Sequence, residues 1–271
     1  MTPLPRWVLV PASAAAVFLA VPLLAMLTRV PWERLPALLG TPAALDALWL
    51  SLRTCALATL LALLLGLPLA LVLSRGRGRW AAAGRVVATV PMVLPPVVAG
   101  LALLVALGRR TWLGSWLASF GVDLAFTTTA VVVAQTFVAM PYLVVSVEGA
   151  LRSAQHDLAV VAATLGASPT TVLRRVTLPL VAPAIASGAA LAFARALGEF
   201  GATLTFAGSL QGTTRTLPLE IYLQRETDAD TAIALAVVLV AVAAILVAAT
   251  ARFADGTVLR PGGPRPWGPR R

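Results

Sequence analysis

The sequence alternates between long apolar stretches and short polar segments. Six apolar stretches approach the length of about 20 residues that an α-helix needs to cross a bilayer. They cover residues 7–27, 48–73, 85–107, 128–147, 180–206 and 231–249. The pattern predicts an all-α, polytopic membrane protein with about six transmembrane helices and no separate soluble domain.

One polar interruption, residues 151–179, is longer than a simple connection between two spans. The residues before Gly166 are good helix formers, and Gly166 supplies the left-handed geometry that ends a helix. Ser168 can cap a second helix with Pro169 at its first position, and the chain then re-enters the membrane after Pro179. We expect two short helices joined by a sharp turn, exposed as a docking surface.

Prolines inside the spans mark positions where regular helix fails, because proline has no backbone N–H. Pro91, Pro95 and Pro96 cluster in the third span, and Pro141 lies in the fourth. Such breaks are tolerated at membrane depth where protein or a water-filled cavity satisfies the freed backbone groups. Two interpretations stay open: the third span bends beside a translocation path, or the prolines form a packing kink that serves only the bundle.

Composition supports the membrane class and excludes several chemistries. Hydrophobic residues make up 59% of the chain and charged residues 12%. All 21 basic residues are Arg, so neither a Walker phosphate loop nor a Schiff-base lysine can form. A single Cys (Cys55) and a single His (His156) cannot supply a metal site. We expect no catalytic residue, no metal and no cofactor in this chain, with Cys55 as a small buried residue and His156 in a structural role.

The arginines are distributed unevenly between the two sides of the predicted membrane. If the N-terminus is cytoplasmic, the inside segments hold Arg6, Arg75, Arg77, Arg79, Arg152, Arg174, Arg175, Arg252, Arg260, Arg265, Arg270 and Arg271. The outside loops then hold Arg29, Arg34, Arg109, Arg110, Arg215 and Arg225. This bias follows the positive-inside rule and places both termini and residues 151–179 in the cytoplasm. The net charge of +10 therefore reflects topology and not nucleic-acid binding.

The interruption resembles the signature loop of permease subunits of ABC importers, whose pattern is E-A-A-x3-G-x9-I-x-L-P. Gly166, Val176, Leu178 and Pro179 fall on that pattern, and Ala162 matches its second Ala. The resemblance implies that this loop docks on a separate ATPase subunit. The implied coupling residues are Val160, Val161, Ala162, Leu165, Gly166, Val176, Leu178 and Pro179. Val160 occupies the position of the family's Glu, so we expect docking to depend on helix shape and apolar burial around Gly166.

Two further stretches resemble the oxyanion branch of these permeases. They are A-R-A-L-G-E-F-G-A-T at residues 194–203 and T-L-P-L-E-I-Y at residues 216–222, the second being similar to molybdate-type permeases. The resemblance implies a non-catalytic pore subunit importing molybdate or tungstate across a bacterial cytoplasmic membrane, with sulfate or thiosulfate as the alternative. It also implies a homodimer, two ABC ATPase subunits that use ATP and Mg²⁺, and an extracytoplasmic substrate-binding protein.

The resemblance divides the chain into four regions. Residues 1–30 hold the first transmembrane helix with a short cytoplasmic N-terminus, and residues 45–250 form the permease core of five transmembrane helices. The coupling loop, residues 150–179, lies within that core. Residues 255–271 form a basic tail that we expect to be disordered and to lie on anionic lipid.

The fifth predicted span carries two charges, Arg195 and Glu199. Being four apart, they lie on one face of a helix and can pair. Charges inside a membrane are costly and usually face a bundle interior or a cavity. One hypothesis places Arg195, Glu199, Thr203, Pro95 and Pro96 along a translocation path. The alternative is that Arg195 and Glu199 form a structural ion pair.

Two other functional classes fit the sequence less well than an importer does. An ion-coupled secondary transporter often shows inverted repeats, and none is evident in this sequence. An intramembrane serine protease would need a Ser–His pair, whereas Ser146 and Ser187 lie in spans and His156 lies in the polar loop.

Overall fold

The computed structural model describes residues 5–153 and 157–256 of the 271-residue chain. Throughout this part the regular elements are helical, which confirms the all-α prediction. The elements are η1 (Arg6–Val8), α1 (Leu9–Thr28), α2 (Leu35–Leu39), α3 (Pro42–Arg75), α4 (Arg79–Val93), α5 (Pro96–Leu107), α6 (Trp112–Ser119), α7 (Thr128–Ser153), α8 (Asp157–Thr164), α9 (Pro169–Val172), η2 (Leu173–Thr177), α10 (Leu178–Leu197), α11 (Gly201–Ala207), α12 (Leu217–Thr227) and α13 (Ala229–Gly256). His156 and residues 257–271, which include most of the predicted basic tail, lie outside the described residues.

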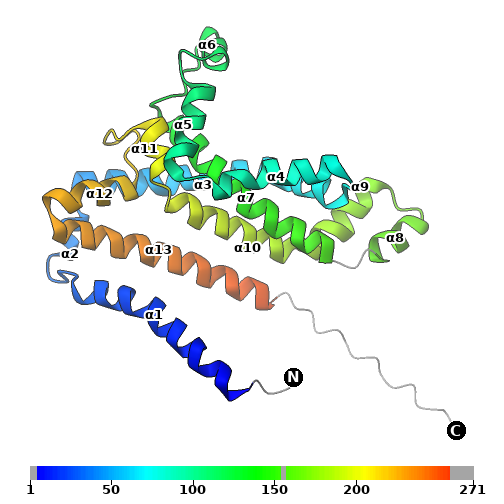
Figure 1. Ribbon diagram of the computed structural model, residues 1–271, viewed down its shortest axis with the longest axis horizontal. Coiled ribbons are helices and arrows are strands. Elements are labelled where there is room, and N and C mark those ends of the chain that lie inside the picture. Colours follow the sequence, from blue (N-terminus) through cyan, green and yellow to red (C-terminus); the bar gives the residue numbers. More distant parts are fainter. Residues whose placement is uncertain (1–4, 154–156, 257–271) are drawn as a thin grey trace.

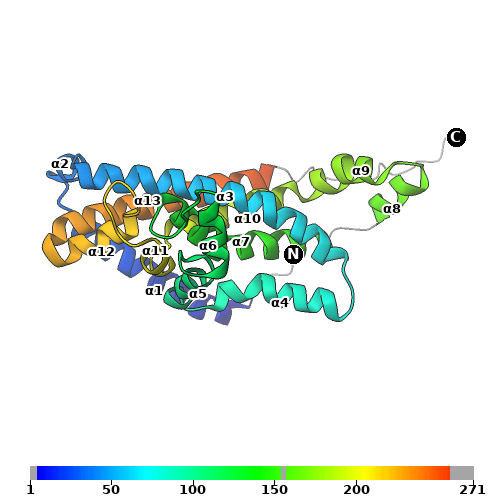
Figure 2. The same cartoon turned by 90° about the horizontal axis from the view of Figure 1, so that it is seen from above.

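Four long helices, α3, α7, α10 and α13, run side by side along the longest axis of the molecule (Figure 1). One end of this bundle carries α8, α9 and the turn between α3 and α4; we call it the α8 end. The opposite end carries α2 and α12 and is called the α12 end. Helices α5 and α6 project sideways from the bundle in Figure 1, and in the view from above they overlie its middle (Figure 2).

The centre of the bundle is α7, which packs against α3 and α10. Small residues recur every four positions on α3, at Ala58, Ala62, Gly66 and Ala70, and all of them are buried. A Cβ added at Gly66 would lie 3.1 Å from the Cγ of Met140 on α7. This seam lets the two backbones approach closely, which is how helices gain packing energy where lipid removes the hydrophobic contribution.

The third predicted span is bent where its prolines cluster. It divides into α4 and α5, whose axes differ by 117° across Leu94 and Pro95. Pro95 cannot donate a backbone hydrogen bond, and it restricts Leu94 to an extended conformation. The expected bend at the prolines of residues 85–107 is therefore present, and α4 and α5 together form either one broken span or a re-entrant loop.

The fifth predicted span, residues 180–206, is a candidate membrane span, but it is not one continuous helix to its predicted end. Helix α10 ends at Leu197, and α11 begins at Gly201 after a non-helical interval. At its other end, α10 continues without a break from α9 through the π-helical turn η2, so that residues 169–197 form one long helical rod. Spans one, two, four and six correspond to α1, α3, α7 and α13.

Candidate coupling and translocation site

Helix α8 presents apolar side chains to solvent at one end of the bundle. Val160 and Val161 are more than half exposed, and Leu165 is 83% exposed. Ala162 is half-buried. Exposed apolar side chains on a short terminal helix are the surface expected of a helix that docks on another protein.

Gly166 ends α8 in the predicted left-handed conformation, with φ of +85°. The Gly166 N–H donates to the Ala163 carbonyl, and the Ala167 N–H donates to the Ala162 carbonyl, both at 3.0 Å. These two bonds form a Schellman motif, which satisfies the last carbonyls of the helix and fixes the turn. The Ser168 hydroxyl then accepts the Thr171 N–H at 3.3 Å, and Pro169 occupies the first turn of α9, as predicted.

The second half of the coupling loop is not a separate short helix, contrary to the sequence prediction. Pro179 lies in the first turn of α10 and does not end the preceding helix. The Leu178 N–H donates to the Leu173 carbonyl, which widens the turn just before Pro179. The π-helical turn thus accommodates a proline that cannot donate to the carbonyl four residues earlier. Val176 and Leu178 are half-buried, and Pro179 is exposed.

The opposite end of the same rod carries the predicted charge pair. The Arg195 Nη1 lies 2.6 Å from the Glu199 Oε2. Arg195 is on the last turn of α10, whereas Glu199 is beyond the end of that helix. The Glu199 Oε1 accepts the Ala202 N–H at 2.7 Å, so one carboxylate joins α10 to the first turn of α11. Glu199 is 1% exposed, while the Arg195 side chain is 26% exposed.

The second halves of the two interrupted helical segments meet, because α5 packs against α11. A Cβ added at Gly201 would lie 2.7 Å from the Pro96 Cβ, and one at Gly100 would lie 2.7 Å from the Ala202 carbonyl oxygen. This close approach brings Pro96 and the residues after Glu199 together. Thr203 is fully buried, and its hydroxyl has no hydrogen-bond partner in the described part of the chain. Pro95 and Pro96 are exposed.

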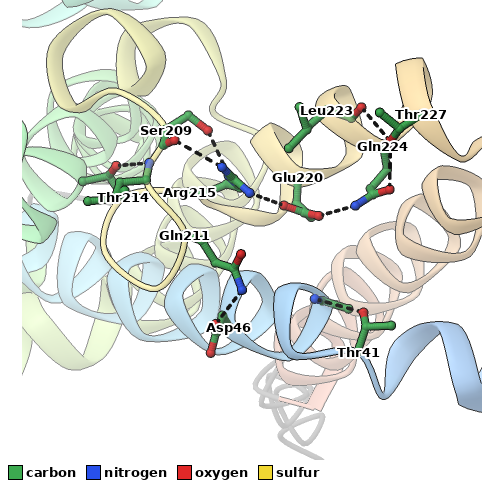
Figure 3. A network of polar contacts seen from close by, with 12 residues as sticks. Thr41, Asp46, Ser209, Gln211, Thr214, Arg215, Glu220, Leu223, Gln224 and Thr227 are labelled. Carbon is green, nitrogen blue, oxygen red and sulfur yellow. Dashed lines mark hydrogen bonds and ion pairs between the residues drawn. The ribbon is translucent and has the colours of Figure 1, made fainter.

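The α12 end carries a polar network that the sequence did not reveal (Figure 3). Glu220, 1% exposed, accepts a hydrogen bond from Gln224 at 2.7 Å and forms an ion pair with Arg215 at 3.3 Å. The Leu217 N–H donates to the Ser51 hydroxyl of α3 at 2.7 Å. The T-L-P-L-E-I-Y stretch is therefore the start of α12, held to α3 by Ser51 and to the preceding loop by Arg215.

A second unpredicted network ties the α8 end together. The Arg85 Nε donates to the Glu148 Oε1 at 2.6 Å, and its Nη2 donates to the Leu73 and Gly76 carbonyls at the C-terminus of α3. Arg152 also contacts Glu148, at 3.1 Å. Glu148, an acidic residue near the end of an apolar span, was the one sequence signal for this network, since such charges are normally paired.

Other predicted features have simple structural surroundings. Cys55 is fully buried on α3, as expected. The Ser146 and Ser187 hydroxyls both donate to the Ala184 carbonyl at 3.2 Å. Among the residues that the structure describes, no group of His, Cys, Asp and Glu side chains could hold a metal ion.

Comparison with known proteins covers nearly the whole chain. Residues 58–255 match the family described as binding-protein-dependent transport system inner membrane component. The chain is 58% identical over 246 residues to the molybdenum transport system permease protein ModB of Mycobacterium tuberculosis, covering 91% of this chain and 93% of the relative. It is 41% identical to ModB of Escherichia coli K12, with 67% and 80% covered. A probable sulfate transport system permease protein cysT of Nephroselmis olivacea is 35% identical, with 68% and 65% covered.

Solved structures show the same fold. A bacterial alginate ABC transporter in complex with an alginate pentasaccharide-bound periplasmic protein aligns with a TM-score of 0.70 at 16% identity, covering 92% of this chain and 93% of that one. The inward-facing MetNI methionine ABC transporter aligns with a TM-score of 0.61 at 18% identity, covering 78% and 94%.

Proposed function

Since the chain belongs to the family of binding-protein-dependent transport system inner membrane components, we propose that it is the pore subunit of an ATP-driven importer of molybdate or tungstate. The observation that supports this substrate assignment is the 58% identity, over 91% of the chain, to a molybdenum transport permease. The sulfate-type relative is less similar, at 35% identity over 68% of the chain. Sulfate or thiosulfate is therefore the second candidate.

Deletion of the gene tests this substrate in cells. We expect a strain lacking the chain to lose uptake of labelled molybdate at low external concentration, while its uptake of labelled sulfate stays normal. Restoring the gene should restore molybdate uptake. Unchanged molybdate uptake together with lost sulfate uptake would contradict the proposal and favour the second candidate.

We also propose that α8 docks on a cytoplasmic ABC ATPase, which binds and hydrolyses the ATP, so that this subunit is non-catalytic. The exposed Val160, Val161 and Leu165 supply apolar area for that contact. The rod of residues 169–197 is about 43 Å long and leads from the Gly166 turn to Arg195. Closure of the ATPase would thus move α8, and the rod would carry that movement to the Arg195–Glu199 pair.

A deletion of residues 158–166 tests the docking role. We expect the deleted chain to insert in the membrane but to lose co-purification of its ATPase. A matched control is Leu158→Ala, which keeps the helix and the turn and shortens one exposed side chain. Co-purification of the ATPase with the deleted chain would refute the docking role.

We propose that two copies of the chain enclose one pore, fed by an extracytoplasmic binding protein. Arg195 is partly exposed on the surface of the single chain, so a closed path beside it needs a second wall. Two segments also present unburied apolar surface: α1, which has no buried residue, and the projecting α5–α6 pair. The positive-inside bias supports a bacterial cytoplasmic membrane with both termini and α8 on the cytoplasmic side.

A further inference from the structure

The turn between α3 and α4 concentrates positive charge without internal compensation. This basic turn, residues 74–79, places Arg75, Arg77 and Arg79 on alternate positions with glycines between them. All three arginines are exposed. Within residues 5–153 and 157–256, none of them forms an ion pair or a side-chain hydrogen bond with the chain. Their charge is therefore available to an external anion.

Nearby groups that could have neutralised these arginines are already used. The carbonyls of Leu73 and Gly76, at the C-terminus of α3, accept hydrogen bonds from Arg85. Glu148, the acidic side chain of the adjoining network, is paired with Arg85 and Arg152. Arg85 thus satisfies the helix end that would otherwise attract Arg75 or Arg77.

An exposed tryptophan follows the basic turn directly. Trp80 is 81% exposed, and the Arg79 guanidinium lies 5.6 Å from the centre of its ring. Four valines on the following turns of α4 are also exposed: Val86, Val87, Val90 and Val93. Tryptophan and arginine next to an apolar helix face are typical of the interface between lipid headgroups and acyl chains.

A matching pair lies on the far side of an apolar strip on α3. Trp49 and Arg53 are exposed, one turn apart. The side chains exposed between Arg53 and Arg75 are dominated by Leu57, Leu60, Leu61, Leu64, Leu65 and Val72. The helix rises about 33 Å from Arg53 to Arg75, close to the bilayer hydrocarbon thickness of about 30 Å. This face of α3 therefore has the dimensions of a lipid-facing surface.

We infer that the basic turn, with Trp80, binds the headgroups of anionic phospholipids in the leaflet at the α8 end. Charge complementarity selects an anionic headgroup, and the flanking apolar faces of α3 and α4 select a lipid over a soluble anion. The binding holds whichever anion the pore carries, so it is independent of the proposed substrate.

The test uses the full chain purified in a zwitterionic detergent and titrated with phosphatidylglycerol or phosphatidylcholine. We expect the wild-type chain to bind phosphatidylglycerol preferentially and to lose that preference at high salt. The triple variant Arg75→Gln, Arg77→Gln, Arg79→Gln should bind phosphatidylglycerol at least about tenfold more weakly, since each arginine near an anionic surface contributes to the attraction. The corresponding triple change to Lys should retain the preference, because it keeps the charge.

A charge-matched control removes three exposed arginines away from the turn: Arg29→Gln, Arg110→Gln and Arg225→Gln. It should keep the preference. Retained preference in the Arg75, Arg77 and Arg79 glutamine variant would overturn the inference. So would unchanged lipid binding together with lost co-purification of the ATPase, which would make the turn a protein contact.

A second measurement needs no folded glutamine variant. The fluorescence of Trp80 is the difference between the wild-type signal and that of Trp80→Phe. Brominated phosphatidylglycerol should quench this Trp80 fluorescence more strongly than brominated phosphatidylcholine does. Equal quenching by the two lipids would contradict the inference.

Discussion

Arg195 and Glu199 are four residues apart and form an ion pair at 2.6 Å, although they do not share a helix. Glu199 uses one carboxylate oxygen for Arg195 and the other for the backbone N–H of Ala202. The pair therefore joins the end of the rod formed by residues 169–197 to the half-helix that packs on α5. This carboxylate therefore links the rod to α11, which packs against α5.

The two hypotheses for this pair can be separated by removing both charges while keeping the shape. Arg195→Met with Glu199→Gln retains an acceptor for the Ala202 N–H and avoids leaving one buried charge alone. If Arg195 contacts the passing anion, we expect uptake to fall about tenfold or more, as for loss of a charged hydrogen bond. Near-normal uptake by an assembled double variant would leave the pair as structural.

The single change Glu199→Ala is the control for this experiment. It should lower the free energy of unfolding by about 3 kcal/mol or more, because it isolates the Arg195 charge and removes a helix cap. A thermal unfolding scan in detergent compares it with the double variant. Equal stability of Glu199→Ala and the wild type would show that the pair is not a structural joint.

Gly166 provides a test of the coupling turn that involves no steric contact. A Cβ at Gly166 would meet nothing within 4 Å, so Gly166→Ala acts only through its φ of +85°. We expect a cost of about 1 kcal/mol in the turn and weaker ATPase co-purification. Gly149→Ala is the matched control, since Gly149 is exposed on helix α7 and also has open space around it. Equal behaviour of the two variants would contradict the role of the left-handed turn.

The crossing of α5 and α11 should be sensitive to one methyl group. Gly201→Ala would place a Cβ 2.7 Å from the Pro96 Cβ, on a rigid ring that cannot turn away. We expect a loss of about 1–3 kcal/mol in stability, measured by thermal unfolding. Gly198→Ala, three residues away, meets only an ordinary contact at 3.7 Å and should be tolerated. A stable Gly201→Ala with normal uptake would show that this crossing is loose.

The sequence predicted the helices that hydropathy determines and missed the details that packing determines. The apolar runs located four continuous spans, and the proline cluster marked the bend after α4. Gly198, the C-cap residue of α10, was a weaker sign of a helix end, because the charges at 195 and 199 also fit an uninterrupted helix. The break depends on the Glu199 carboxylate capping α11 and on Gly201 meeting Pro96, which are tertiary contacts.

The prediction that a short helix ends before Pro179 was wrong for a related reason. Proline near a membrane boundary usually ends a helix, but a widened turn at Leu173–Thr177 lets the helix continue through it. The Arg85–Glu148 pair joins residues 63 positions apart, so no local sequence pattern predicts it. In contrast, the Gly166 turn and the Ser168 cap are local, and both were predicted from the residues alone.

Asp228, at the α12 end, should make the stability of the fold depend on pH in a measurable way. Its carboxylate accepts the Thr231 hydroxyl at 2.7 Å and the backbone N–H groups of Thr231 and Asp230. These bonds, the Thr231 hydroxyl first, hold the pKa of the Asp228 carboxyl below its usual value of 3.8. Because the pKa of this carboxyl is lower in the folded state, Asp228 stabilises the fold at pH values above its unfolded-state pKa. This stabilisation is lost as the pH falls through the folded-state pKa.

The stabilities of the wild type and of Asp228→Asn, measured by thermal unfolding, should therefore differ by a constant amount from pH 5 to pH 8. The difference should shrink only as the pH falls below 3.8. A difference that already shrinks between pH 7 and pH 5 would contradict this assignment.

ATP-driven uptake in sealed vesicles tests the central claim most directly. The chain is reconstituted with its ATPase and its binding protein, and the initial rate of labelled molybdate uptake is measured with and without a hundredfold excess of competitor. We predict uptake that requires ATP, falls to background with tungstate and is unchanged with sulfate. Uptake without ATP, or equal competition by sulfate, would contradict the account.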